Sequence, residues 1–198
     1  MNRQVRLSDN LYTDRSVYMS IEKKSPRARI LATAGPLFHR EGYRAVGIDR
    51  IIAQSGVAKA SFYHHFPAKD DLIVAFIAAS EQHAATALPG PDGAAPLSAY
   101  VDALIDIAQT PTCAGCAYQG TAAEFADPTH PAHAASLGVK TRTLEALRLR
   151  AERQGLADPN AVAERIFLLL EGVWAVVRMF GDGAPITGAK AAARKLMG

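Results

Sequence analysis

One segment, Ile48 to Lys69, constrains this chain more than any other, because its pattern predicts two short helices joined by a tight turn. The first helix carries three isoleucines and ends at Ser55-Gly56. The second surrounds one apolar aromatic, Phe62, with polar side chains and stops before Pro67, since proline has no N–H to donate and disfavours helix in the preceding residue. Two short helices around a Gly-containing turn, the second rich in hydrogen-bonding groups, are typical of a helix-turn-helix that reads DNA.

The rest of the chain also predicts helices alone, with neither strand-like alternation nor internal repeats. Ser25 is a good N-cap and Pro26 suits the first helical position, so a helix should run from there to a stop at Gly42, kinked at Gly35-Pro36. A Pro/Gly-rich stretch at 88–96 marks a junction further on. Helical spacing predicts the remaining helices at 69–87, 97–109, 117–126, 130–154, 159–181 and 186–197.

Positive charge gathers in the first third of the chain. Residues 1–70 hold 12 Lys and Arg against 6 Asp and Glu, whereas residues 71–198 hold 10 against 13. A basic N-terminal third followed by a slightly acidic remainder fits nucleic-acid binding by the N-terminal third. We expect a cytoplasmic protein without membrane contact, since no apolar run approaches the ~18 residues of a membrane helix and no signal peptide is apparent.

An ordered series of residues runs through the predicted helix-turn-helix and just beyond it: Gly56-Val57, Lys59, Ser61, Tyr63-His64-His65-Phe66, Pro67-Ala68-Lys69 and Asp70-Asp71-Leu72. With this series, residues 26 to about 80 resemble the DNA-binding domain of the tetracycline-repressor (TetR) family. The resemblance implies a three-helix helix-turn-helix domain at 26–70 and a helical effector-binding and dimerisation domain at 71–198, within an all-α protein. Residues 1–25 are polar and mixed in charge without a helical period, so we expect a flexible arm there.

The same resemblance implies which residues contact operator DNA. Base and phosphate contacts are expected from Arg27, Arg29, Lys59, Ser61, Tyr63, His64 and Lys69. The alternative for each arginine is an ordinary solvated surface charge. This chain departs from the family pattern at Gly47 and Ala58, where side-chain caps worth about 1 kcal/mol each are missing, and at His65, where an aromatic residue is common.

The helix predicted at 159–181 is apolar around nearly its whole circumference, so it should be buried on every side. One side can pack on its own domain and the other needs a partner. The pattern therefore predicts a homodimer, and the family resemblance implies an interface of four helices. Its expected contacts are Phe167, Leu170, Trp174 and Val177.

An effector pocket is implied only by the resemblance, and its small-molecule ligand cannot be read from the residues. Each candidate has core packing as its alternative. The candidates are apolar or aromatic side chains on the helices that enclose the family's pocket, with one carboxylate: Phe76, Tyr100, Leu104, Tyr118, Glu124, Phe125, Phe167 and Trp174.

Cys113 and Cys116 form a C-x-x-C pair, which suits a redox couple or half of a metal site. The alternative is two small apolar residues beside a turn, since a second ligand pair and a βαβ context are both lacking. Three functions stay open: a ligand-released repressor on a palindromic operator, a thiol- or metal-sensing regulator, and a small thiol oxidoreductase. We favour the first, and so expect no enzymatic activity, cofactor or bound metal.

Overall fold

A computed structural model describes residues 25–90, 94–110 and 113–198, and in these ranges all regular structure is helical. The all-α prediction is thereby confirmed. The arm predicted at 1–25 lies outside the described residues except for Ser25. None of the described helices is long and apolar enough to cross a membrane. The elements are α2 (Pro26–Glu41), α3 (Ile48–Ser55), α4 (Lys59–His65), α5 (Lys69–Ala87), α6 (Leu97–Ala108), α7 (Ala117–Glu124), α8 (Pro131–Arg153), α9 (Pro159–Phe180), η1 (Gly181–Gly183) and α10 (Ala189–Met197).

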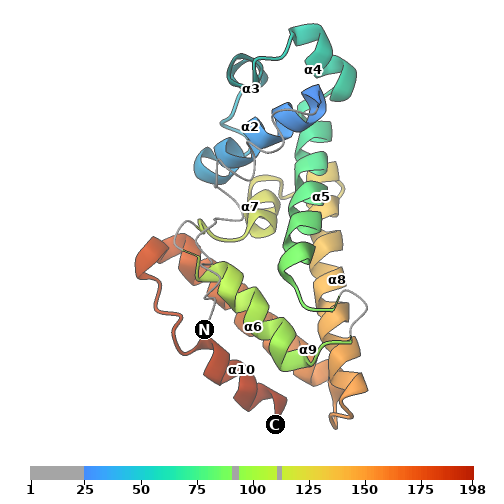
Figure 1. Ribbon diagram of the computed structural model, residues 1–198, viewed down its shortest axis with the longest axis vertical. Coiled ribbons are helices and arrows are strands. Elements are labelled where there is room, and N and C mark those ends of the chain that lie inside the picture. Colours follow the sequence, from blue (N-terminus) through green and yellow to red (C-terminus); the bar gives the residue numbers. More distant parts are fainter. Residues whose placement is uncertain (1–24, 91–93, 111–112) are drawn as a thin grey trace, which may run out of the picture.

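The molecule is elongated, with a small head at one end and a larger helical body at the other (Figure 1). Helices α2, α3 and α4 form the head, and α5 leads from it along α8 into the body. Helices α6, α9 and α10 lie at the far end, while the short α7 lies between head and body. Two helices, α5 and α7, therefore connect the parts.

The first head helix begins where the sequence predicts. The Ser25 hydroxyl oxygen accepts a hydrogen bond from the Ala28 N–H at 3.2 Å, and Pro26 occupies the first turn. The helix then runs without interruption through Pro36 to Glu41. It ends at Gly42, whose backbone φ of 89° lies in a region that residues with a Cβ rarely adopt.

The apolar core of the head continues past the domain boundary predicted at residue 70. Phe38, Phe62 and Phe66 are buried among the head helices. The same cluster includes residues of α5, α7 and α8, together with Phe125 just after α7, namely Leu72, Ile73, Phe76, Ile77, Ala117, Phe125, Ala132 and Val139. Each large buried side chain stabilises the fold by about 1.5–3 kcal/mol, so this shared core fixes how the head sits on the body.

A second apolar cluster holds the body together. It is built from α6, α8, α9 and α10, and its fully buried members include Leu97, Ile105, Leu147 and Ile166. Leu170, Trp174 and Val177 of α9 belong to the same cluster. Helix α9 is thus the central element of the body.

Candidate nucleic-acid interface and ligand pocket

Helix α4 presents a polar surface at the tip of the head. Lys59, Tyr63 and His64 are exposed and Ser61 is half-buried, while Phe62 is fully buried against the other head helices. The Tyr63 ring stands edge-on to Phe62, with ring centroids 5.4 Å apart, and remains 42 % exposed. Four of the predicted contact residues therefore lie where a DNA groove could reach them.

The caps of α3 and α4 are as the sequence predicts. Gly47 and Ala58 precede these helices, and neither supplies a side-chain hydrogen bond to the first turn. The backbone N–H groups at both N-termini are thus available to other acceptors, which include phosphate oxygens.

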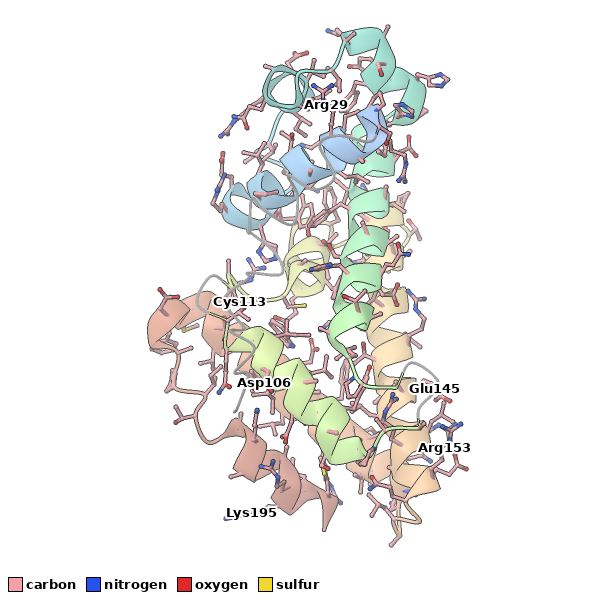
Figure 2. The ribbon with its side chains drawn as sticks, in the orientation of Figure 1. Arg29, Asp106, Cys113, Glu145, Arg153 and Lys195 are labelled. Carbon is pink, nitrogen blue, oxygen red and sulfur yellow. The ribbon has the colours of Figure 1, made fainter. Side chains whose placement is uncertain are left out.

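The two arginines predicted to contact phosphate have different surroundings. Arg27 is exposed, with its guanidinium 5.4 Å from the Phe66 ring centroid. Arg29 instead turns inward, and its Nη2 donates to the carbonyl oxygens of Ser55 at 2.6 Å and Gly56 at 2.9 Å. Figure 2 shows Arg29 among the head helices. Because the last carbonyls of a helix lack partners within it, Arg29 caps the end of α3 and is engaged within the head.

Lys69 is likewise engaged within the head. Its ammonium donates to the carbonyl oxygen of Arg44 at 3.0 Å, and partial burial lowers the pKa of Lys69. Arg50, another cation of the head, forms a two-pronged ion pair with Glu41. Of the four cationic residues predicted to contact DNA, Arg27 and Lys59 are exposed, whereas Arg29 and Lys69 are half-buried.

Three of the residues predicted to contact a ligand, Phe76, Glu124 and Phe125, lie at the junction between head and body. The Glu124 carboxylate accepts hydrogen bonds from the N–H groups of Tyr43 at 2.9 Å and Arg44 at 2.7 Å. Phe76 and Phe125 pack around the Tyr43 ring, with centroid distances of 6.2 and 6.4 Å. The helical pattern of the sequence places Phe76, Glu124 and Phe125 on or beside helices α5 and α7. It does not show that these side chains contact the head.

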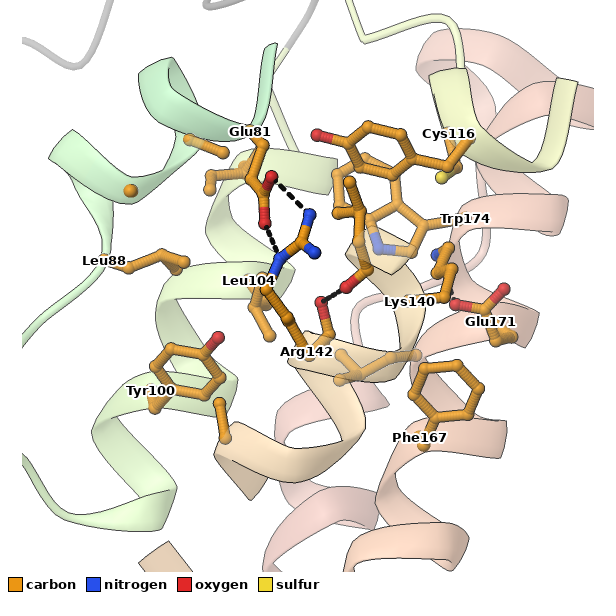
Figure 3. Close-up of a pocket in the computed structure, with 18 of the residues that line it drawn as sticks. Glu81, Leu88, Tyr100, Leu104, Cys116, Lys140, Arg142, Phe167, Glu171 and Trp174 are labelled. Atoms are coloured by element: carbon orange, nitrogen blue, oxygen red, sulfur yellow. Dashed lines mark hydrogen bonds and ion pairs between the residues drawn. The ribbon is translucent and has the colours of Figure 1, made fainter. Parts of the chain in front are cut away.

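A cavity of about 260 Å³ lies between α5, α6, α8 and α9 (Figure 3). Five of the predicted ligand residues line it: Tyr100, Leu104, Tyr118, Phe167 and Trp174. The volume is slightly below the ~300–1,000 Å³ of pockets for drug-sized ligands, so the cavity suits a small molecule.

The cavity also contains charged side chains that the sequence did not single out. On the α5 side, Glu81 accepts from Arg142 at 2.6 and 2.7 Å. On the α9 side, Glu171 pairs with Lys140 and accepts from the Gln119 amide at 2.8 Å. Both pairs are visible in Figure 3. One of these charges could have been found from the sequence. Lys140 precedes Leu144 by four residues, so it lies on the apolar face of α8, where a charged residue is unexpected.

Arg150 is the fifth charged residue of the cavity. It is 4 % exposed, and its guanidinium lies 3.9 Å from the Tyr100 ring centroid. Its nitrogens donate to the carbonyl oxygens of Ala146 at 3.0 Å and Gly90 at 2.6 Å. Arg150 therefore closes one end of the cavity by joining α8 to the segment after α5.

The two cysteines are free thiols, and both are buried. Cys116 lines the cavity, whereas Cys113 does not, and burial raises the pKa of the Cys113 thiol. Within the described ranges no three His, Cys, Asp or Glu side chains gather as metal ligands. The histidines that follow the cysteines in sequence have other contacts: His130 stacks on the Phe125 ring with centroids 4.3 Å apart, and His133 Nδ1 lies 2.7 Å from the Phe125 carbonyl oxygen. The metal-sensing alternative thus gains no support from these residues.

The residues that α9 exposes to solvent are not the ones predicted to form the dimer interface. Leu170, Trp174 and Val177 are buried in the chain's own core, and Phe167 lines the cavity, because this side of α9 faces α6 and α8. The side that faces outward carries Leu168, which is 70 % exposed, and Met179, which is 79 % exposed. Gly172 and Ala175 are exposed between them, so an unpartnered stripe follows the spacing i, i+4, i+7, i+11.

Comparisons with known proteins agree with this arrangement. Residues 30–76 match the family model for bacterial regulatory proteins of the tetR family. YxaF of Bacillus subtilis, an uncharacterised HTH-type transcriptional regulator, is 45% identical over 49 residues, which is 24% of this chain and 26% of that relative. The chain thus matches about a quarter of the length of this curated relative.

Two solved structures extend the similarity to the body. A TetR-family transcriptional regulator from Streptomyces coelicolor has a TM-score of 0.80 and 29% sequence identity, covering 87% of this chain and 94% of its own. A putative tetR transcriptional regulator from Streptomyces avermitilis has a TM-score of 0.73 and 27% identity, covering 87% of this chain and 97% of its own. Head and body therefore occur together in these structures, in a similar arrangement.

Proposed function

Because this chain belongs to the TetR family of DNA-binding transcriptional regulators, we propose that it is an effector-released repressor that binds a palindromic operator as a homodimer. The observation that carries the proposal is the polar, exposed surface of α4, formed by Lys59, Tyr63 and His64. We assign base contacts to Ser61 and His64, and phosphate contacts to Lys59, Tyr63 and Arg27. A cytoplasmic location is part of the proposal, since operator DNA lies there.

Two helices give the cavity a physical connection to the head. Helix α5 carries Glu81 at the cavity and Lys69 at the head, where the ammonium holds the Arg44 carbonyl. Helix α7 is preceded by Cys116 at the cavity and ends at Glu124 on the head. An effector that moves either helix changes the position of α3 and α4, provided that it binds the two states with different affinity.

The stripe of Leu168, Gly172, Ala175 and Met179 is the surface proposed for the homodimer. The four residues form one exposed apolar face along α9, on the side opposite the chain's own core. The glycine has no atoms within 4 Å of where a Cβ would lie, so a second helix can approach closely there. A two-fold dimer would place two α4 helices on successive major grooves, about 34–36 Å apart.

The test is fluorescence anisotropy with duplex DNA from immediately upstream of the protein's own gene, against a scrambled duplex, over a range of salt concentrations. We expect tight, sequence-dependent binding that is lost in the Lys59→Ala/His64→Ala variant. Because these side chains are exposed, the variant should keep the fold, which circular dichroism checks. Equal and weak binding to both duplexes, at this site and at other candidate operators, would contradict the proposal.

A further inference from the structure

Three of the four aromatic rings that line the cavity already face cations of the protein. The Lys140 Nζ lies 5.8 Å from the Tyr118 ring centroid and 5.9 Å from that of Phe167. The Arg150 guanidinium lies 3.9 Å from the Tyr100 ring centroid. A cationic ligand gains most from an aromatic cavity when ring faces are open to it. Here Lys140 and Arg150 already lie over three of the rings. A cationic ligand near these rings would therefore be repelled by the two side chains.

The charges that line the cavity also favour a negative ligand. Three cations, Lys140, Arg142 and Arg150, line it together with two carboxylates, Glu81 and Glu171. With all five groups ionised the lining carries one net positive charge. In a water-poor site, charges are stabilised chiefly by opposite charges close by. A ligand with one negative charge would therefore balance the lining.

The two ion pairs of the cavity differ in how easily a ligand can replace one partner. The Lys140 and Glu171 side chains are 18% and 26% exposed, and Gln119 also binds this carboxylate. The Arg142 side chain is 61% exposed, and that of Glu81 is 33% exposed. Arg142 therefore lies at the mouth, where Glu81 can turn to water and a ligand carboxylate can take its place on the guanidinium with similar two-pronged geometry.

Apart from its charged groups, much of the cavity wall is apolar. The apolar lining includes Leu88, Leu104, Ile107, Leu170 and Trp174. We propose that the cavity takes a small amphipathic monoanion, whose carboxylate binds Arg142 in place of Glu81 and whose apolar body packs beside Trp174. This inference rests on the proposed function, because it names the chemical class of the effector.

Trp174 provides a direct test, since it is the chain's one tryptophan and lines the cavity. The full-length protein, without DNA, is titrated with 4-phenylbutyrate, 4-phenylbutylamine and 4-phenylbutanol, which share one carbon skeleton and differ in charge. Trp174 fluorescence is excited at a wavelength where the probes do not absorb, and calorimetry checks each affinity. We expect the carboxylate to bind at least about tenfold more tightly than the alcohol, a difference of ~1.4 kcal/mol, and the amine to bind most weakly.

Matched variants locate the charge that is responsible. Arg142→Gln should abolish the preference for the acid over the alcohol, and Glu81→Gln should increase it by removing the competing carboxylate. Arg148→Gln is the control, because Arg148 lies on the same helix but pairs with Glu145 and Glu152 and does not line the cavity. If Arg142→Gln keeps the preference as fully as Arg148→Gln does, the role of Arg142 is overturned.

Tighter binding of the amine or the alcohol, or no binding of the carboxylate at millimolar concentration, would overturn the ligand class. These titrations contain no DNA, so their result is independent of operator binding. Failure of the anisotropy experiment would remove the proposed function and leave the measured ligand preference of the cavity unchanged.

Discussion

The carboxylate of Glu124, at the end of α7, accepts a hydrogen bond from the backbone N–H of Tyr43 at 2.9 Å, across 81 residues of sequence. The same carboxylate accepts from the Arg44 N–H, so it holds two N–H groups that follow the end of α2. Gly42 is necessary to this contact, since a Cβ there would lie 2.8 Å from the Glu124 Oε1. The loop between α2 and α3 is thus fixed by the body.

We predict that Glu124→Ala destabilises the protein by about 1–3 kcal/mol, because two backbone donors lose a charged acceptor. Urea unfolding followed by circular dichroism measures the change. Glu164→Ala is the control, since Glu164 is an exposed carboxylate on α9, and should change the free energy of unfolding by less than about 0.5 kcal/mol. Equal stability of the two variants would contradict a holding role for Glu124.

Substitutions of Arg29 and Arg27 should have different effects, the first on stability and the second on DNA binding. Arg29→Ala removes the side-chain partner of the Ser55 and Gly56 carbonyls, so we expect a loss of about 1–3 kcal/mol in the free energy of unfolding. Arg27→Ala should leave stability nearly unchanged but reduce the salt dependence of operator binding by about one phosphate contact. Thermal unfolding and anisotropy across salt concentrations measure the two effects, and the reverse pattern would refute both assignments.

The elements of this fold are predictable from the sequence because their signals are local. Ser25, Gly42 and Pro159 mark helix ends through backbone chemistry that neighbouring residues determine. Which residues meet across the fold is not predictable in this way. Leu170 and Trp174 are expected on a dimer surface, yet α6 and α8 cover that side of α9. Likewise, the spacing of Glu124 gives no indication that Tyr43 lies beside it.

Charged residues of the cavity escape prediction for a related reason. Glu81 and Arg142 lie 61 residues apart and each resembles a solvated helix charge, so only the packing of α5 against α8 reveals the pair. Helical spacing shows that Tyr100, Leu104, Phe167 and Trp174 lie on apolar helices, and only the family resemblance marks them as residues of a pocket. The apolar wall is therefore predictable with the help of the resemblance, whereas the pairing of its charges is not.

His39 should make stability depend on pH. It is 8 % exposed, and burial, reinforced by the charge of Arg178, lowers the pKa of His39 from 6.5 to about 4. Because the folded-state pKa lies below the unfolded value, this residue contributes stability that is fully present above pH ~6.5 and is lost as pH falls toward ~4. At pH 5 the loss relative to pH 7 should be roughly 2 kcal/mol.

His39→Leu removes this titration, so its stability should fall less between pH 7 and pH 5 than that of the unaltered protein. Urea unfolding at both pH values measures the difference. His64→Ala is the control, because His64 is exposed on α4, and it should keep the original pH dependence. If His39→Leu and His64→Ala respond to pH alike, His39 is not a buried neutral group.

The outward face of α9 gives the last prediction. Leu168 is 70 % exposed in the apolar stripe, so Leu168→Glu would place two like charges in the interface of the proposed dimer. We expect a monomer by sedimentation velocity, and weaker operator binding because the two heads no longer act together. Leu137→Glu is the matched control, as Leu137 is 55 % exposed on α8 outside the stripe, and should remain dimeric. A dimer that persists in Leu168→Glu would assign the interface to another surface, and a monomer in both variants would show that the stripe is not specific.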